Sequence, residues 1–410
     1  MPRPFSYKEA LAWLYGTQRF GIKLGLENMQ RLLHALHLPA PGPRIIHVAG
    51  TNGKGSVCAM IDAISRAAGH RTGLFTSPHL VTFRERIQVD GAIISENAVA
   101  AGLTSIRQLV ADWQPHPTFF EITTAIALLH FREHACALLV LETGLGGRLD
   151  ATNAVASTVA VITPIAYDHQ SWLGHTLEEI AGEKAGIIKA KAPVVSAVQE
   201  PAAEKVLRVR AAECDAPLQF VSDCYRETPL ALAGLHQKRN AALALAALRS
   251  AKLELDDTAI ARGLASVEWP ARFQLWDTRT VIDGAHNPAG AHILSQTWRE
   301  NFGDARATLI LAVLDDKDVA GICRALAPIT ALAFLPHIRS ARAMSPSLLQ
   351  QTFREVATDI PTSIFPSFSA ALERARQTSS PVLITGSLHF AGEALAALRR
   401  VPAAFEECAQ

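Results

Sequence analysis

The sequence predicts an α/β protein with two domains, each built on a mostly parallel sheet. With 410 residues, the chain is longer than a single hydrophobic core usually serves, so two domains are expected. Apolar runs recur along the chain with helical patterns between them, which is the alternation typical of an α/β fold. Several runs are continuously apolar, and such strands belong to a parallel sheet that is covered on both faces.

The expected N-terminal domain begins with the apolar run 45–49, which a glycine-rich loop follows directly. Apolar residues then return at helical spacing from Ser56 to Ala68, and Gly69 suits the C-cap of that helix. Strand, loop and helix thus occur in the order that a phosphate-binding loop requires. Further strands are predicted at 72–75, 136–141 and 158–163.

A second, smaller α/β domain is predicted after an alanine-rich helix at 240–251 and a loop that contains Trp269, Pro270 and Arg272. We place the boundary near 274–279, which gives domains over 1–274 and 280–410. The strands of the second domain are predicted at 280–282, 308–313, 331–335 and 382–385.

The composition excludes several classes of function. Apolar residues make up 49% and charged residues 19%, and the formal net charge is +1 without long runs of one sign, so neither nucleic acid nor a membrane surface is expected as a partner. The six cysteines form no CxxC pair, which argues against a zinc site or disulfide framework and favours a reducing compartment. Without a signal pattern or an apolar stretch of ~20 residues, the protein is expected to be cytoplasmic.

The loop after the first strand, Gly50-Thr51-Asn52-Gly53-Lys54-Gly55-Ser56, predicts a phosphate-binding site. It departs from the common G-x-x-x-x-G-K-[ST] pattern, because Val48 stands at the first glycine and Gly55 separates Lys54 from Ser56. Small residues that expose backbone N–H groups, a lysine and a following helix N-terminus all remain. Ser56 offers a hydroxyl that can face a metal or cap this helix. The alternative is a tight turn with a surface lysine.

Oxygen-bearing residues follow the other predicted strands. Thr76-Ser77-Pro78-His79-Leu80 comes after 72–75, Glu142 ends the second run before a glycine-rich stretch, and Asp168-His169 follows the third run. Ligands of parallel sheets bind beyond the strand carboxyl ends, and oxygen ligands suit magnesium. Beside a phosphate loop, an acid such as Glu142 commonly faces Mg·ATP. The structural alternatives are an ordinary strand-ending turn and a salt-bridged glutamate.

Other polar positions are uninformative individually. Glu183-Lys184 has the pattern of a solvated helix face, and a lone histidine such as His169 is more often structural. Arg272 stands in a loop, whereas Asp283 ends a strand of the second domain and can therefore line an interdomain cleft.

Taken together, these elements resemble the folylpolyglutamate synthase/dihydrofolate synthase family of the Mur ligase superfamily. The matching stretches run in the order of the family over nearly the whole chain. They are Leu24-Gly25-Leu26-Glu27, HVAGTNGKGS (47–56), TSPHL (76–80), LETGLGGRLDATN (141–153), DHQSWLG (168–174), EKAGI (183–187), Arg272-Phe273, DGAHNP (283–288) and ITGSLHFAGE (384–393).

The resemblance implies an N-terminal P-loop ATPase domain and a C-terminal Rossmann-like domain, with the reactants meeting between them. It implies that ATP phosphorylates a carboxylate of the pterin substrate and that the amine of L-glutamate attacks the acyl phosphate. The implied substrates are a folate or dihydropteroate, L-glutamate and ATP, with two Mg²⁺ sites, in a monomeric enzyme. Positioning and charge neutralisation carry such a transfer, which suits a residue set without a Ser-His-Asp arrangement.

The resemblance also implies roles for individual residues. Lys54, Lys184 and His169 are expected to act in catalysis, and Lys184 matches a lysine that family members carbamylate. That reaction needs a neutral amine, and burial beside cations would lower the lysine pKa from ~10.4. The expected nucleotide contacts are Thr51, Asn52, Gly53, Lys54, Gly55, Ser56, Asn240, Arg272 and Asp283; the metal ligands are Ser77, Glu142 and His169. The expected pterin contacts are Thr118, Phe119, Phe120, Glu121, Leu149, Asp150 and Ala151.

One position departs from the family pattern and bears on the substrate. Family members that make dihydrofolate often have an acid just before the Leu-Gly-Leu-Glu stretch, where this chain has Lys23. Addition of glutamate to a preformed folate is therefore the firmer expectation, and a second activity on dihydropteroate stays a hypothesis.

Two other functions compete with this interpretation. A Mur-type cell-wall ligase would need a further N-terminal domain, whereas about 44 residues precede the first strand here. A nucleotide switch without ligase chemistry would need the phosphate loop but not Arg272, Asp283 and His286 in a second domain.

Overall fold

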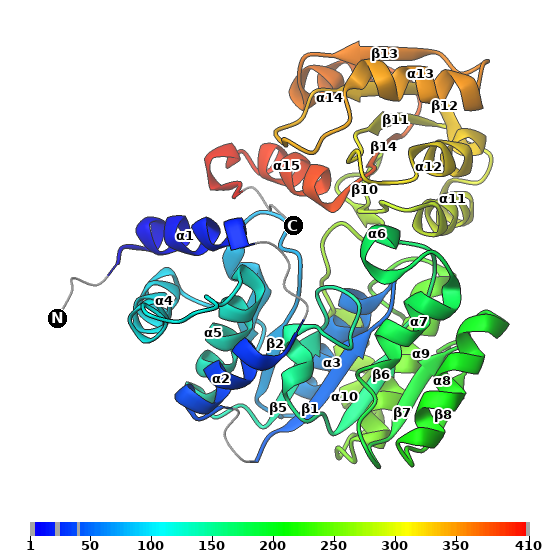
Figure 1. Ribbon diagram of the computed structural model, residues 1–410. Helices are drawn as coiled ribbons and strands as arrows, with labels where there is room; N and C mark the ends of the chain where they lie inside the picture. The colour runs from blue at the N-terminus through cyan, green and yellow to red at the C-terminus, as the bar shows by residue number, and fades with distance from the viewer. Residues whose placement is uncertain (1–4, 21–24, 39–41, 407–410) are drawn as a thin grey trace.

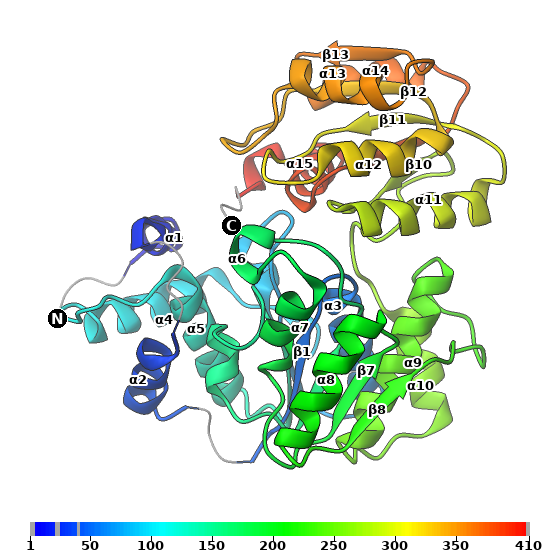
Figure 2. The ribbon, with the colours of Figure 1, turned by 45° about the vertical axis from the view of Figure 1, so that its right-hand side comes forward.

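The computed structural model describes residues 5–20, 25–38 and 42–406. It contains two α/β domains, and Figure 1 shows the C-terminal domain lying above the N-terminal one. Figure 2 shows the same separation after rotation, with α6 at the side of the N-terminal domain that faces the second domain. Lys23 lies outside the described residues.

The N-terminal sheet has eight strands in the order β4-β3-β2-β5-β1-β6-β7-β8. Strand β1 is central and pairs in parallel with β5 and β6, whereas β3 and β4 form an antiparallel edge. The strands are β1 (Arg44–Ala49), β2 (Thr72–Phe75), β3 (Ile87–Val89), β4 (Ala92–Ile93), β5 (Leu138–Glu142), β6 (Val159–Ile162), β7 (Val194–Ala197) and β8 (Leu218–Val221).

Helices cover both faces of this sheet, as the continuously apolar strands require. Along β5, Leu139 packs into the core beneath α1, α2, α4 and α5, whereas Val140 packs into the core beneath α3, α9 and α10. The helices are α1 (Tyr7–Gly16), α2 (Glu27–Leu36), α3 (Lys54–Ala67), α4 (Glu96–Leu109), α5 (Phe119–Glu133), α6 (Gln170–Leu173), α7 (Leu177–Ala185), α8 (Pro201–Glu213), α9 (Leu235–Ser250) and α10 (Asp257–Ser266), with 3₁₀ turns η1 (Thr17–Phe20), η2 (Phe83–Arg86) and η3 (Ala151–Ala154).

The C-terminal sheet has six strands in the order β13-β12-β11-β14-β10-β9, and only the β9–β10 pair is antiparallel. Helices again lie over two separate cores, one on each face. The elements are β9 (Gln274–Leu275), β10 (Thr280–Ile282), α11 (Pro288–Phe302), β11 (Ala307–Leu311), α12 (Val319–Leu326), η4 (Ala327–Ile329), β12 (Thr330–Pro336), α13 (Pro346–Val356), β13 (Thr362–Phe365), α14 (Phe368–Arg376), β14 (Val382–Thr385), α15 (Leu388–Leu398) and η5 (Pro402–Ala404).

The two mostly parallel sheets confirm the predicted α/β fold class. Six short strands, β3, β4, β7, β8, β9 and β13, were not predicted. Of these, β8 and β13 lie at sheet edges and are only partly buried, so their apolar patterns are weak. The alanine-rich helix begins at Leu235 rather than at Asn240. The predicted cap at Gly69 shifts by one residue: Ala68 is the C-cap, and Gly69 follows in a left-handed conformation.

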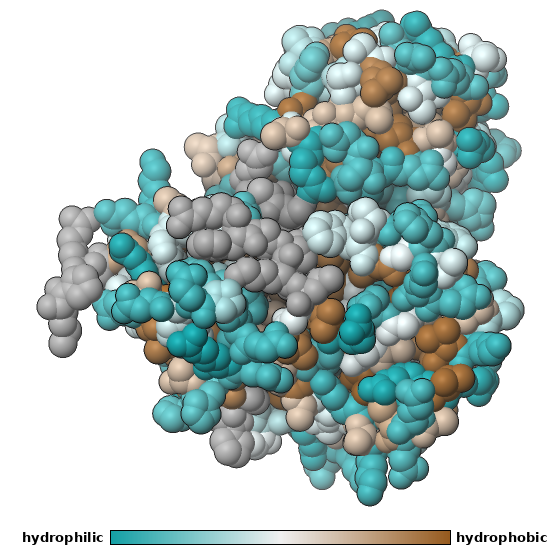
Figure 3. Space-filling view, viewed as in Figure 1, coloured by the Kyte–Doolittle hydropathy of each residue, from teal (hydrophilic) through white to brown (hydrophobic). Residues whose placement is uncertain are grey.

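The visible surface is mostly hydrophilic, with apolar side chains scattered over both domains (Figure 3). Within the described residues, no helix combines the length and apolar character needed to cross a membrane. Because β1, β2, β5 and β6 are parallel, the segments that follow them meet at one end of the N-terminal sheet. The predicted site residues in these segments therefore share that end.

Candidate active site

The phosphate loop leaves β1 and is held against the segment that follows β6. The backbone N–H groups of Thr51 and Asn52 donate to the carbonyl of Pro164, at 3.0 and 3.3 Å. Gly50 has φ +145°, and a Cβ there would collide with Thr163. The neighbouring strand thus fixes the path of the loop, which needs glycine at Gly50 because the backbones approach closely.

Helix α3 begins at Lys54, and its N-cap is Gly53, with φ +91°. The prediction that Ser56 caps this helix is therefore wrong, because Ser56 lies inside the first turn. Its buried hydroxyl accepts a hydrogen bond from the Gln237 amide at 3.2 Å. Asn240 donates to the other atom of that amide, Gln237 Oε1, and its side chain lies against Gly53. Helix α9 thereby supports the start of α3.

Two lysines converge on one carbonyl of the phosphate loop. Lys54 Nζ donates to Gly50 O at 3.1 Å and to Thr51 O at 3.2 Å. Lys184, on α7, donates to Gly50 O at 2.9 Å and is only 4% exposed. Burial, together with the charge of Lys54, lowers the pKa of Lys184 to about 7. The solvated helix face considered for Lys184 is therefore excluded, and the amine exists in both protonation states near neutral pH.

The glycine-rich stretch after β5 brings α7 and Lys184 close to the sheet. A Cβ at Gly147 would meet the carbonyls of Glu183 and Lys184, so only glycine allows this approach. The Arg148 guanidinium bonds Glu183 Oε1 at 2.7 and 3.1 Å, and Arg148 N donates to Glu183 O at 2.7 Å. These contacts fix α7 relative to the phosphate loop.

Glu142, at the end of β5, is buried beside cations. Its Oε2 accepts a hydrogen bond from the backbone N–H of Ser77 at 3.0 Å, which brings two predicted metal ligands together. Burial raises the pKa of Glu142, against the opposing effects of Lys54, the Ser77 N–H group and Arg272. No salt bridge closer than 4 Å is found for this carboxylate within the described part of the chain. Its oxygens thus retain capacity for a cation, unlike those of a salt-bridged structural glutamate.

Asp168 joins the two domains. Its Oδ1 accepts hydrogen bonds from Lys317 Nζ and from the backbone N–H of His169, both at 2.9 Å. Its Oδ2 accepts from Asn287 at 3.1 Å and lies 3.5 Å from His286 Nε2. Burial alone would raise the pKa of Asp168, but the contacts with His286, His169 and Lys317 hold it well below its usual range. The carboxylate is therefore ionised and fully used in contacts.

The neighbouring His169 adopts a left-handed backbone conformation with φ 50°, as N-cap of α6. Its side chain is 40% exposed. Burial of the ring and the cations Lys317 and Lys54 lower its pKa to about 4, against the opposing charge of Asp168. The imidazole is neutral at physiological pH, as a metal ligand requires.

The C-terminal domain also reaches the phosphate loop directly. Asn287 and Asn52 exchange side-chain amide hydrogen bonds at 3.1 and 3.4 Å. Asp283 accepts from the backbone N–H groups of Phe273 and Ala285, at 2.7 and 2.8 Å. The guanidinium of Arg272 lies near both Asp283 and Glu142 in charge interaction, and burial lowers its pKa. The segment between the domains therefore brings Arg272 close to Glu142.

Comparisons with known proteins agree with this geometry. Residues 48–216 match the Mur ligase middle domain, and residues 271–388 match the glutamate ligase domain of Mur ligases. The dihydrofolate synthase/folylpolyglutamate synthase of Bacillus subtilis is 36% identical over 428 aligned residues, which cover 94% of this chain and 97% of that protein. The chain belongs to the dihydrofolate synthase/folylpolyglutamate synthase family.

Solved structures extend the likeness to three dimensions. The E. coli FolC complex with DHPP and ADP superimposes with a TM-score of 0.87 at 32% identity, covering 97% of this chain and 98% of that one. The Yersinia pestis bifunctional folylpolyglutamate synthase/dihydrofolate synthase, complexed with AMPPNP and a Mn ion, gives 0.86 at 32% identity, covering 97% and 98%. Relatives in this family thus hold an adenine nucleotide and a divalent cation.

The segments that the family resemblance assigns to the pterin site also stabilise local structure through hydrogen bonds. Thr118 is the N-cap of α5, and Glu121 completes a capping box by accepting from the Thr118 backbone N–H at 2.7 Å. Asp150 accepts from the N–H groups of Gly144 and Leu145, at 2.9 and 3.0 Å. Its carboxylate therefore orders the glycine-rich stretch from within.

The two aromatic residues of this set, Phe119 and Phe120, pack against neighbouring side chains and backbone. Phe119 stacks on Tyr15 with ring centroids 5.5 Å apart, and the guanidinium carbon of Arg86 lies 5.5 Å from the centroid of the Phe119 ring. Phe120 packs where a Cβ at Gly144 would stand. Leu149 and Ala151 continue the glycine-rich stretch beside Asp150. The pterin assignment of all seven residues stays a prediction.

Sequence analysis missed Lys317, Asn287 and Gln237 as parts of the site. Lys317 stands in a loop and would pass for a surface cation, and its burial beside Asp168 depends on the second domain. Asn287, in the DGAHNP motif, could have been identified as a helix N-cap, because it stands just before Pro288. Nothing in the sequence near Gln237 indicates that it contacts Ser56.

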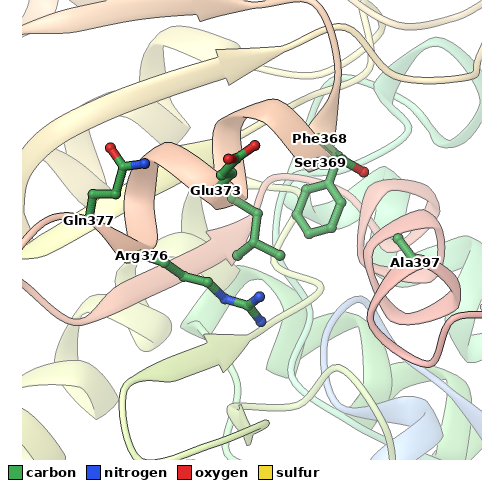
Figure 4. A pocket seen from close by; sticks show the side chains of 7 residues that line it. Phe368, Ser369, Glu373, Arg376, Gln377 and Ala397 are labelled. Carbon is green, nitrogen blue, oxygen red and sulfur yellow. The ribbon is translucent and has the colours of Figure 1, made fainter.

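No group of three or more His, Cys, Asp or Glu side chains with metal-binding geometry occurs among residues 5–20, 25–38 and 42–406. A cation at this site would therefore need hydroxyl, phosphate or water oxygens besides Glu142 and His169, which is how Mg²⁺ is usually held. A separate surface pocket is lined by Phe368 and Arg376 of α14, by the following Gln377 and by Ala397 of α15 (Figure 4). It contains none of the predicted site residues.

Proposed function

We propose that this protein is an ATP-dependent ligase that adds L-glutamate to folates through an acyl phosphate. The observation that carries the proposal is the convergence of Lys54, Lys184 and Glu142 beside the phosphate loop, at the point where Asn287 brings in the second domain. Relatives named for both folate reactions and solved with nucleotide and Mn support the substrate class.

In the first step, a carboxylate oxygen of the folate attacks the γ-phosphorus of ATP, and the bond to the β-phosphate oxygen breaks. Lys54 and the N–H groups at the start of α3 are placed to neutralise the transferring phosphates. The amine of L-glutamate then attacks the acyl carbon, the bond to phosphate breaks, and the amine loses a proton. ADP and phosphate leave together with the amide product.

The residues present fit Mg²⁺, because the buried carboxylate of Glu142 has one backbone hydrogen bond, from Ser77, and no ion pair closer than 4 Å among the described residues. Ser77, Glu142 and His169 would hold it. When bound, Mg²⁺ neutralises charge on the phosphate oxygens. We assign nucleotide contacts to Thr51 through Ser56 on the loop side, with Asn240, Arg272 and Asp283 opposite. A second Mg²⁺ would take an oxygen ligand from the modified lysine described next.

We further propose that Lys184 reacts with CO₂ to form a carbamate. The Nζ lone pair forms a bond to carbon, a C–O π bond opens, and the amine releases a proton. The pKa of about 7 supports this step, since a large share of the amine is neutral at pH 7 to 8. The product is a carboxylate-like group beside Lys54.

Glutamate addition to dihydropteroate is a second candidate activity, supported by the bifunctional names of the relatives. The substitution of Lys23 for an acid weighs against it. We place the reaction in the cytoplasm, in keeping with five free cysteines among the described residues, and in a monomer, because one chain supplies both sides of the site.

One assay tests the proposal: ADP release by the purified protein with Mg·ATP, L-glutamate and either a reduced folate or dihydropteroate. We expect release that requires both glutamate and the reduced folate. Hydrolysis that ignores both substrates would indicate a nucleotide switch, and release only with a UDP-linked cell-wall precursor would indicate a Mur-type ligase. No release with dihydropteroate would limit the enzyme to polyglutamylation.

A further inference from the structure

The end of the described chain returns to the N-terminal domain. After α15 and η5, Glu406 lies beside the segment that links β2 to β3, and Figure 1 shows the red C-terminal elements next to the light-blue segment. Helix α15 also lies close to this segment: a Cβ at Gly392 would collide with the Leu80 carbonyl. The C-terminal domain therefore touches the segment that begins with Ser77.

The carboxylate of Glu406 accepts hydrogen bonds from three groups of the N-terminal domain. The donors are the phenol of Tyr7 at 3.1 and 3.2 Å, the hydroxyl of Thr82 at 3.1 Å and the backbone N–H of Phe83 at 2.6 Å. Burial, with the charge of Glu406, raises the pKa of the Tyr7 phenol well above its usual value, so the phenol keeps its proton. Hydrogen bonds to a charged acceptor are stronger than neutral ones.

The backbone of Glu406 contributes two more contacts. Its N–H donates to Val81 O at 2.8 Å, and its carbonyl lies 3.1 Å from His79 Nε2. Arg86 Nε can only donate and lies 2.9 Å from His79 Nδ1, so Nδ1 accepts and Nε2 carries the proton toward Glu406. Burial and the charge of Arg86 lower the pKa of His79 well below its usual value, which keeps the ring neutral.

The segment fixed in this way holds its own shape through Glu85. The Glu85 carboxylate accepts from the N–H groups of Leu80, Val81 and Thr82, at 2.7, 3.1 and 3.1 Å. Its first residues connect to the active site, because Ser77 N–H donates to Glu142. Glu406 therefore contacts residues 79–83 of the same segment whose first residues lie at the active site.

From these contacts we infer that Glu406 is a positioning residue, which holds the Ser77 segment where its hydroxyl meets the metal. The inference rests on the proposed function, because it takes Ser77 as a metal ligand. It assigns the C-terminal domain a part in building the metal site as well as in presenting Asp283 and Asn287. Glu406 itself does not touch the reactants.

The test is Glu406→Gln, with Glu373→Gln as control. Glu373 is an exposed acid on α14 and has no bond to the N-terminal domain among the described contacts. Binding of Mn²⁺ is measured by electron paramagnetic resonance with a non-hydrolysable ATP analogue, and the Mg²⁺ dependence of turnover is measured in parallel. We expect Glu406→Gln to weaken metal binding about tenfold, the cost of a lost charge-assisted network, with KM for glutamate unchanged. The control should match wild type.

Unchanged Mn²⁺ affinity in a folded Glu406→Gln variant would overturn the inference, even if its melting temperature fell. If that variant does not fold, Tyr7→Phe removes one donor only and should weaken Mn²⁺ binding by about threefold. The proposed function fails separately, when wild-type protein with bound Mn²⁺ and nucleotide releases no ADP with any folate. The metal readout therefore tests Glu406 whatever the substrate.

Discussion

Glu142 and Asp168 are both acids that follow strands of the same parallel sheet, yet the structure uses them in opposite ways. Asp168 lies among Lys317, His286 and Asn287 and accepts hydrogen bonds with both oxygens. Glu142 accepts one backbone hydrogen bond, and the cations around it stay farther away. Burial raises the pKa of Glu142, whereas its partners hold the pKa of Asp168 well below the usual range.

This difference indicates which acid is available to a ligand. A carboxylate whose oxygens are already satisfied stabilises the ionised state and the contacts around it. Burial of a carboxylate without a close ion-pair partner is costly, and a bound cation would offset that cost. Position at a strand end marks both residues as candidates, but only the neighbours from the second domain distinguish an acid whose oxygens are already engaged from one that could accept a ligand.

The largest expected effect is that of Glu142→Gln. The amide keeps the size of the side chain but cannot supply a charged oxygen, so kcat/KM should fall by about a hundredfold to a thousandfold. The free energy of unfolding without ligands should stay the same or rise, because a buried charge is removed. Turnover is measured by ADP release and unfolding by urea titration. Near-normal turnover would show that Glu142 is not a metal ligand.

The next largest effect concerns Lys184, whose pKa of about 7 depends on burial beside Lys54. Lys184→Ala should reduce kcat by about a hundredfold, because a charge-stabilising group is lost beside the phosphates. If Lys184 acts as a carbamate, short carboxylic acids should restore part of the activity. In wild type, activity should fall as pH drops below 7 and as CO₂ is removed, since protonated amine cannot react. Wild-type rates in the variant would leave Lys184 a structural lysine.

Much of this site could be predicted from the sequence, for reasons that differ among residues. The phosphate loop and Glu142 could be predicted from nearby residues alone, because a strand, a turn and a helix in sequence order determine where they lie. Lys184 could be identified only through the family resemblance, since its local pattern is that of a solvated helix face and its burial depends on the glycine-rich stretch at Gly147. Lys317 and Glu406 could not be found, because their partners lie 149 and more than 300 residues away.

A moderate effect is expected when the Asp168 contact is broken. Asp168→Asn removes the nearer of the two carboxylates that contact the buried Lys317 and leaves only Asp316, at 3.5 Å, which should lower the free energy of unfolding by about 2 kcal/mol. Lys317→Met alone should cost a similar amount, and the double variant should cost less than the sum. Arg210→Met is the control, because Arg210 pairs with Glu213 at the end of α8 and with neither Asp168 nor Lys317. Strict additivity in urea titrations would contradict the coupling.

The smallest expected effect is the pH dependence that separates the two acids. The folded-state pKa of Asp168 is depressed, so its contribution to stability is complete above the ordinary Asp pKa of ~3.9 and is lost only below it. The folded-state pKa of Glu142 is raised, so the folded protein binds a proton first and gains stability as pH falls through that value. Between pH 8 and 5, the stability difference between wild type and Asp168→Asn should stay constant. As pH falls toward the ordinary Glu pKa of ~4.3, the free energy of unfolding of wild type should rise relative to that of Glu142→Gln. Urea titrations at each pH measure both differences, and the opposite trend for either variant would mean that its carboxylate is not in the environment described.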